Sequence, residues 1–149
     1  MIVSLGSDHR GIEQRQLIAG VVRDAGHEVD DCGTHTTDSC DYPDIAASVA
    51  RQVALQQTDR GILICGTGIG VSIAANKING IRAAVCHDTH TVEMSRRHND
   101  ANILCISAML GEPQMREMVK LWLTTPFDGE RHQRRVQKIK ELECSPSTG

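Results

Sequence analysis

The chain has 149 residues, of which 40% are hydrophobic and 2% aromatic, and its formal net charge is −3. This length predicts one domain with an aliphatic core, while the shortage of aromatic rings and the slight negative charge argue against nucleic acid as a partner. No apolar run is long enough to cross a bilayer and no export signal is visible at the start, so we expect no membrane partner.

Apolar runs alternate with amphipathic segments along the chain. Strands are predicted, in order, over residues 2–6, 27–32, 62–65, 81–86 and 102–107. The first helix is predicted from the end of the loop at 7–11 to about residue 25, and the second from Pro43 to about residue 54. Further helices are predicted in the segments 71–76, 87–100, 112–123 and 130–143. This alternation favours an α/β fold with a parallel sheet, in a single domain over residues 1–143 with a disordered tail at 144–149.

The carboxyl ends of parallel strands meet at one edge of a sheet, because the crossovers between them are right-handed, and ligands bind at that edge. We therefore expect three polar segments to meet there. They are the loop with Asp8 and His9, the glycine-rich turn at residues 65–70, and the polar segment that ends near Asn99.

The central stretch of the sequence is GILICGTGIGVSIAANK, residues 61–77, in which an apolar strand leads through a glycine-rich turn into a helix of small residues. A dinucleotide fingerprint needs a glycine, and a cysteine phosphatase loop an arginine, at the position of Val71; a Walker loop needs a Gly-Lys-Ser/Thr that is also absent. What is left is a loop whose backbone N–H groups can stabilise a small anion or an enediolate oxygen.

Cys65 is the last residue of the strand in this stretch. A lone cysteine can be a buried structural thiol. It can also be a general base, because the positive end of the following helix would stabilise a negatively charged sulfur. The spacing alone leaves both interpretations open. The six cysteines contain no CxxC pair and no zinc-ligand spacing, which predicts reduced thiols in a cytoplasmic protein.

Two further polar positions have alternative interpretations. His98 either contacts the last carbonyls of the predicted polar helix or acts as a general acid and base near neutral pH. Asp8 either caps the first helix or, together with His9, offers a carboxylate and an imidazole at the end of the first strand.

Two helical patterns concern charged ligands. His87, His90 and Glu93 are spaced like a metal-binding face, but two histidines three residues apart on a polar helix are usually only solvated, and we predict no metal site. Arg131 and Arg135 lie one helical turn apart, as a bidentate phosphate clamp requires; the alternative is an exposed basic helix face.

Together these segments resemble the type B ribose-5-phosphate isomerase family, which includes isomerases of related aldose phosphates. The matching motifs run in family order over nearly the whole chain: SDHRG (7–11), DYPD (41–44), the central stretch (61–77), GIRAAVC (80–86), SRRHNDANIL (95–104) and GERHQRRV (129–136). The resemblance implies a doubly wound, Rossmann-like three-layer sandwich with a mostly parallel five-stranded sheet. It also implies no metal or organic cofactor, and a homodimer or dimer of dimers with active sites at the subunit interface.

The resemblance further implies catalytic roles. Cys65 matches the base that moves a proton between C1 and C2 of the sugar, which places the chain in the thiol-base branch of the family. His98, aided by Asp8, matches the residue that opens the furanose ring. Thr67 matches a position near the transferred proton. The loop that holds the enediolate matches Gly66, Gly68, Ile69 and Gly70.

Substrate contacts follow from the same resemblance. His9, Arg131 and Arg135 match phosphate contacts, and the arginines are ones that the partner subunit can supply. Asn99 matches a substrate contact, and Tyr42 matches a wall of the pocket.

Two departures from the family pattern bear on the substrate. Met109 stands where many members carry a phosphate-binding arginine, and Glu130 replaces a common glycine before the first helix arginine; Arg10 and Arg134 are positive charges that could compensate. We predict an aldose–ketose isomerase that acts on a small phosphorylated sugar, first a pentose 5-phosphate, then a tetrose or hexose phosphate. The alternative is a non-catalytic protein of the same fold that binds a phosphosugar or another anion.

Overall fold

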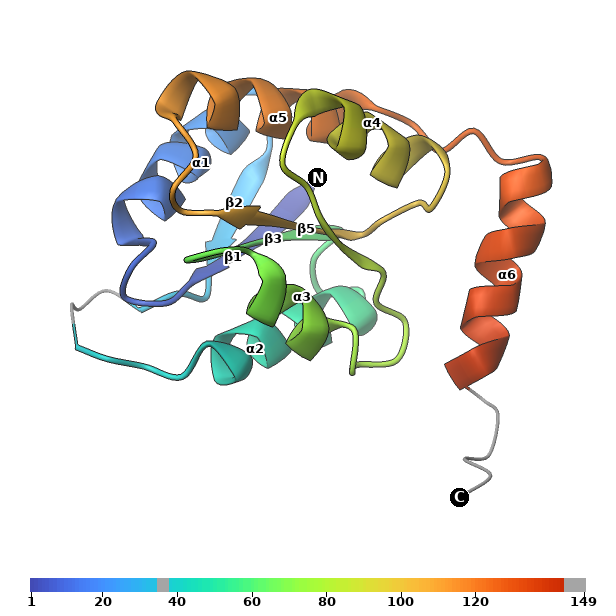
Figure 1. The fold of residues 1–149 in the computed structure, drawn as a ribbon, viewed down its shortest axis with the longest axis horizontal. Coiled ribbons are helices and arrows are strands. Elements are labelled where there is room, and N and C mark those ends of the chain that lie inside the picture. Colours follow the sequence, from blue (N-terminus) through green and yellow to red (C-terminus); the bar gives the residue numbers. More distant parts are fainter. Residues whose placement is uncertain (35–37, 144–149) are drawn as a thin grey trace.

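The computed structural model describes residues 1–34 and 38–143 (Figure 1). The strands are β1 (Ile2–Ser7), β2 (Glu28–Asp31), β3 (Arg60–Cys65), β4 (Ala83–Val85) and β5 (Ile103–Ser107). The helices are α1 (Ile12–Asp24), α2 (Tyr42–Ala54), α3 (Ile69–Ala75), α4 (Thr89–Arg97), α5 (Glu112–Thr124) and α6 (Arg131–Glu143). Each predicted strand and helix is present, with its ends moved by a few residues. The tail predicted at 144–149 lies outside the described residues.

The five strands form one sheet in the order β2-β1-β3-β5-β4, and every neighbouring pair is parallel. Helices α1, α4 and α5 cover one face of the sheet, whereas α2 and α3 cover the other (Figure 1). The doubly wound three-layer prediction is therefore confirmed, with a sheet that is parallel throughout. The strand order reverses between β1 and β3, and in such sheets ligands bind in the crevice at that point.

The apolar pattern of each element explains the two faces of the core. On one face Met115, Met118, Val119 and Trp122 of α5 are buried against α1 and the sheet. On the other face the small and β-branched side chains of α2 pack against β3 and α3, namely Ala46, Val49, Ala50 and Val53. Two helix ends have residues that suit their positions. Gly26 follows α1 in the left-handed region (φ 87°), and Pro43, the predicted start of the second helix, lies in the first turn of α2.

Helix α6 differs from the others because it stands beside the sandwich, beyond the amino ends of the strands (Figure 1). Within the chain it buries only His132 and Val136 among its residues, while Ile139 and Leu142 are 42% and 72% exposed. The N–H of Gly80 donates a 2.8 Å hydrogen bond to the Glu143 carboxylate at its far end. An amphipathic helix of this kind has an apolar side that its own chain covers only in part.

The described residues contain no helix with the length and apolar character needed to cross a membrane. Cysteines 32, 40, 65, 86 and 105 are free thiols.

Candidate active site

The glycine-rich turn lies at the carboxyl end of β3, where it is held by backbone geometry that only glycine tolerates. Gly68 has a φ of 79°, and a Cβ on it would lie 3.0 Å from the backbone of Ile106. The Ala108 N–H donates to the carbonyl of Cys65 at 2.8 Å, and the Ser107 hydroxyl donates to the carbonyl of Gly66 at 2.7 Å. The end of β5 therefore fixes the position of the turn.

Cys65 is 5% exposed, and its sulfur accepts a hydrogen bond of 3.1 Å from the N–H of Gly68. Thr67 uses its hydroxyl oxygen in the same way, accepting from the N–H of Ile69 at 3.2 Å. Two backbone donors of the turn are thus aimed at side-chain atoms within it. The donor at Gly68 suits a sulfur that carries negative charge.

Asp8 and His9 follow β1, the strand that pairs with β3 at the reversal point of the sheet. Asp8 is buried, and its Oδ1 accepts the N–H of Arg10 at 3.0 Å. The N-cap of α1 is Gly11, so the interpretation of Asp8 as that cap is wrong. The imidazole Nδ1 of His9 lies 3.4 Å from the Cys40 N–H, which donates to it, and this contact links the β1 loop to the segment before α2.

Tyr42 begins α2 and lies directly over Gly70, because a Cβ on that glycine would come within 2.7–2.9 Å of three Tyr42 ring and hydroxyl atoms. The structure thereby gathers one set of predicted site residues at the carboxyl edge of the sheet. We call this set the carboxyl-edge group: Asp8, His9, Tyr42, Cys65, Thr67 and the turn residues Gly66, Gly68, Ile69 and Gly70.

His98 and Asn99 are not part of this group, so the prediction that the segment ending near Asn99 lies at the carboxyl edge is wrong. α4 starts near the carboxyl end of β4 and carries the chain back to the amino edge before β5 begins. There the carbonyl of Asn99 accepts a 3.0 Å hydrogen bond from Nε of Arg82, which precedes β4. β3 has six residues, so the two edges are separated by about 17 Å.

His98 has neighbours at the amino edge that the sequence reasoning missed. Its ring stacks on that of His132, with centroids 4.1 Å apart and an interplanar angle of 11°. Burial lowers the pKa of His132, and the positive charges of His98, Arg131 and Arg135 lower it further. In the sequence His132 is the second residue of the RHQRR run, and its spacing carries no signal of a contact with His98.

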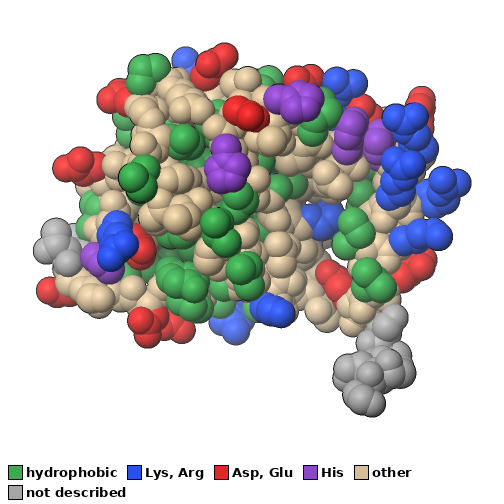
Figure 2. Space-filling model, viewed as in Figure 1, with side chains coloured by type: hydrophobic (Ala, Val, Ile, Leu, Met, Phe, Trp, Pro, Cys, Tyr) green, Lys and Arg blue, Asp and Glu red, His purple; other side chains and the backbone are tan. Residues whose placement is uncertain are grey.

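Arg131 and Arg135 are exposed on α6, near the same edge. Figure 2 shows blue basic side chains gathered along this helix at the right of the molecule. With His98, Asn99 and His132 these arginines form a second set, which we call the amino-edge group. The chain therefore carries the predicted site residues in two separate places.

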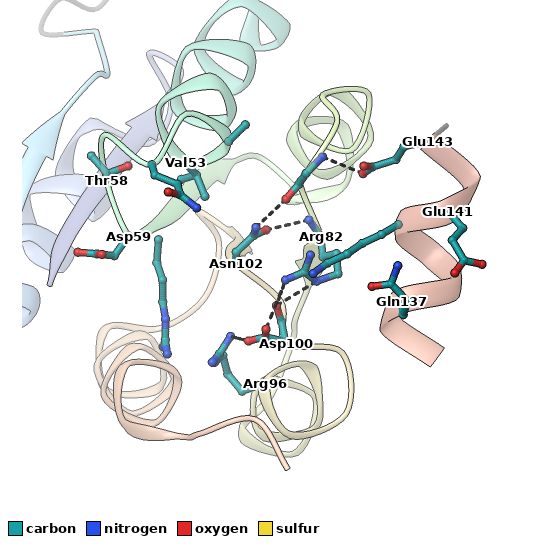
Figure 3. A pocket seen from close by; sticks show the side chains of 15 residues that line it. Val53, Thr58, Asp59, Arg82, Arg96, Asp100, Asn102, Gln137, Glu141 and Glu143 are labelled. Atoms are coloured by element: carbon teal, nitrogen blue, oxygen red, sulfur yellow. Dashed lines mark hydrogen bonds and ion pairs between the residues drawn. The ribbon is translucent and has the colours of Figure 1, made fainter. Parts of the chain in front are cut away.

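A cavity of about 910 Å³ lies at the amino edge between α6 and the sandwich (Figure 3). Its polar groups largely satisfy one another: Asp100 pairs with Arg96 at 2.9 Å and with Arg82 at 3.5 Å, and Asn102 bonds the backbone of both Gly80 and Arg82. Among residues 1–34 and 38–143, no cysteine or histidine lines it. This cavity is therefore a feature of the amino edge, whereas Cys65 of the same chain lies at the end of β3, at the opposite edge of the sheet.

Comparison with known proteins identifies the family. The model of the Ribose/Galactose Isomerase family matches residues 3–139. Ribose-5-phosphate isomerase B of Escherichia coli (strain K12) is 43% identical over 142 residues, which cover 95% of each chain. D-erythrulose-4-phosphate isomerase of Pectobacterium atrosepticum is 36% identical over 92% of this chain and 91% of its own. The structure of Clostridium thermocellum ribose-5-phosphate isomerase B superposes with a TM-score of 0.94 at 48% identity, covering 97% and 98% of the two chains.

Proposed function

This chain belongs to the ribose/galactose isomerase family and is a sugar-phosphate isomerase, and on that premise we propose that Cys65 is its catalytic base. The reaction is the interconversion of an aldose phosphate and its ketose through an enediolate. The single-domain body over residues 1–143 carries it without metal or organic cofactor. The free thiols support a cytoplasmic location.

We further propose that each active site is shared by two copies of the chain. The supporting observation is that Cys65 and His98 lie at opposite edges of one sheet, too far apart for both to reach the same small sugar. A homodimer that brings the carboxyl-edge group of one copy against the amino-edge group of the other would complete two identical sites. A dimer of dimers would use the same pairing.

Exposed apolar side chains support this assembly. Ile69 and Ile73 on α3 are 51% and 57% exposed, and Ile139 and Leu142 leave the apolar side of α6 uncovered. β4 is an edge strand of the sheet. Burying these groups against a second copy would remove apolar surface from water, which lowers the free energy by roughly 25 cal/mol for each Å² buried.

The chemistry then divides between the two groups. His98 of the partner subunit donates a proton to the ring oxygen, while Asp8 accepts the proton of the anomeric hydroxyl, and the furanose opens. Cys65 as thiolate removes the proton from C2 of the aldehyde, and the electrons move to O1 to form the enediolate. Backbone N–H groups of residues 66–70 stabilise that negative charge. The proton of the O2 hydroxyl then passes to O1, and Cys65 returns its own proton to C1, near Thr67, which leaves a carbonyl at C2 and completes the ketose.

The phosphate would be held by His9 together with the partner subunit's Arg131 and Arg135. Tyr42 and the partner subunit's Asn99 would close the pocket around the sugar. Bidentate arginines are suited to a phosphate because their donors match its oxygens. Ribose 5-phosphate is the first candidate substrate. A four-carbon phosphosugar is the second, because Met109 removes an expected charge and a relative of this chain is an isomerase of D-erythrulose 4-phosphate.

Subunit complementation tests the shared site. Cys65→Ser alone should lower kcat by about 10²–10⁴, as loss of a general base does, and His98→Asn should impair turnover of the closed ring. When the two variants are mixed and allowed to exchange subunits, about a quarter of the wild-type activity should return, since half of random dimers are mixed and each has one intact site.

The control pairs Cys65→Ser with the double variant Cys65→Ser/His98→Asn, in which no intact site can form. Absence of recovery in the first mixture, despite verified exchange, would assign both residues to a single chain and contradict the shared site. A panel of four- to six-carbon aldose phosphates, assayed with the wild-type protein, identifies the substrate.

A further inference from the structure

We propose that His98, Asp128 and His132 form a reversible binding site for a divalent transition-metal ion such as Zn²⁺, and that the bound ion inhibits the isomerase. The binding half of this proposal depends only on the geometry of these residues. The inhibition half rests on the proposed function, because it requires His98 to act on the sugar ring.

The three side chains converge from different segments. His98 directly follows α4 as its C-cap, Asp128 lies in the connection before α6, and His132 lies in the first turn of α6. One ligand atom from each lies within 4.8 Å of the other two. The backbone fixes this arrangement, since the N–H of Asp128 donates to the carbonyl of Arg97 at 3.0 Å and the N–H of His132 donates to that of Gly129 at 3.0 Å.

A tetrahedral zinc ion with bonds of about 2.0–2.1 Å needs ligand atoms about 3.3 Å apart. Each pair must therefore approach by no more than roughly 1.5 Å, a movement that rotation of side chains provides without moving the main chain. Imidazole lone pairs lie in the ring planes, which are 11° from parallel, so at least one of the two rings must rotate out of the stack for both nitrogens to face one ion. Two imidazoles and one carboxylate then leave the fourth position for water, as in reversible and catalytic zinc sites.

Competing charges make this a weak site. Nε of Arg97 donates to both oxygens of Asp128 at 3.2 and 3.1 Å, although a carboxylate has further lone pairs for a metal. Arg131 and Arg135 add positive charge nearby. The ion is consequently one that binds and leaves, and no step of isomerisation uses it. Bound to the ring nitrogen of His98, it would occupy the lone pair needed for opening the furanose.

Calorimetric titration of the full-length Cys65→Ser protein with Zn²⁺ tests binding without interference from the catalytic thiol. We expect one ion per chain and a loss of about tenfold or more in affinity for His132→Gln and Asp128→Asn, since even outer-sphere partners of metal ligands are worth about 10–100-fold. The side chain of Asp128 is partly exposed, so Asp128→Asn should leave the fold intact. This variant therefore still tests the site if His132→Gln disturbs folding. His90→Gln, an exposed histidine on α4, is the matched control and should bind unchanged.

Arg97→Gln gives a test of opposite sign, which misfolding cannot imitate: removing the competing guanidinium should tighten binding. Equal affinity in the His132→Gln, Asp128→Asn and parent proteins, or a loss confined to His90→Gln, would refute the site and leave the isomerase proposal untouched. With Cys65 intact, Zn²⁺ should inhibit, a chelator should reverse the effect, and Arg97→Gln should shift inhibition to lower Zn²⁺. Binding at this site without inhibition would instead refute the proposed role of His98.

Discussion

The hydroxyl of Ser107 connects the end of β5 to the turn that carries Cys65: it donates a 2.7 Å hydrogen bond to the carbonyl of Gly66 and accepts the Met109 N–H at 3.1 Å. Ser107 is also the register partner of Cys65 in the sheet. The orientation of the glycine-rich turn therefore depends on a side chain that has no place in the reaction itself.

Ser107→Ala should lower kcat by about tenfold and leave KM nearly unchanged, because a misplaced turn weakens stabilisation of the enediolate; displacements near 1 Å can cost about 10²-fold. The free energy of unfolding should fall by about 1 kcal/mol, the usual worth of one hydrogen bond. Steady-state kinetics and urea unfolding measure the two effects. Ser4→Ala is the matched control, since the Ser4 hydroxyl is buried on β1 and bonds Gln52 and Thr58. An equal loss of kcat in both variants would contradict a positioning role.

Met109→Arg should lower KM for ribose 5-phosphate by about tenfold, because one charge-assisted hydrogen bond to the phosphate contributes about 1.5–3 kcal/mol. The Met109 side chain is 87% exposed just beyond β5, so the substitution leaves the core intact. Leu55→Arg places the same charge on an exposed residue at the end of α2 and should leave KM unchanged. A similar KM for both variants and the wild type would show that position 109 does not face the phosphate.

Glu130→Gly should raise the free energy of unfolding by about 1 kcal/mol. Glu130 has a φ of 51°, in the left-handed region where side chains with a Cβ are strained at a cost on the order of 1 kcal/mol. Glu130→Ala removes the same carboxylate but retains the Cβ, so it separates backbone strain from charge. Stabilisation by alanine equal to that by glycine, in denaturant or thermal unfolding, would assign the effect to charge.

The stability of the protein should decrease above about pH 8.5, partly through Cys105. Burial raises the pKa of its thiol well above the usual value, and the neighbouring thiols of Cys65 and Cys86 add to the shift. The native state therefore keeps the proton while the unfolded chain releases it, so the contribution is intact below the unfolded pKa and is lost as pH rises toward the folded pKa. Urea unfolding of wild type and Cys105→Ala between pH 7 and 10 compares the slopes. Parallel curves would exclude Cys105 as the source.

The sequence was sufficient to predict the order of elements and the position of the Asp8–His9 loop and of the turn at 65–70 at the carboxyl edge, because aliphatic strands alternate regularly with amphipathic helices and strand ends mark the ligand edge. Tyr42 begins a helix, and only the family resemblance pointed to it. The same rule misplaced His98, which follows a helix and not a strand: nine residues of α4 extend about 13 Å and return the chain to the other edge. A residue directly after a strand lies at the carboxyl edge of the sheet, whereas a residue after the helix that follows lies at the amino edge.

The spacing of residues along the sequence did not predict contacts between distant segments. Nothing in the spacing of RHQRR indicates that His132 would stack on His98, 34 positions away, since that contact depends on the path of the chain through Asp128. Ile139 and Leu142 of α6 are exposed, and the periodicity of a helix does not show whether such apolar residues are covered by their own chain or by another.

The detached position of α6 has a consequence for its amide protons. An isolated helix of 13 residues is marginal in water, because the cost of nucleation is recovered only over about 12–15 residues. Since α6 buries so little within its own chain, its backbone hydrogen bonds should open more readily than those of α1 or α5. The proposed homodimer would cover this helix, so on that proposal hydrogen exchange there should slow as protein concentration increases. The protection of the α6 amide protons from exchange would then measure the fraction of chains that are paired.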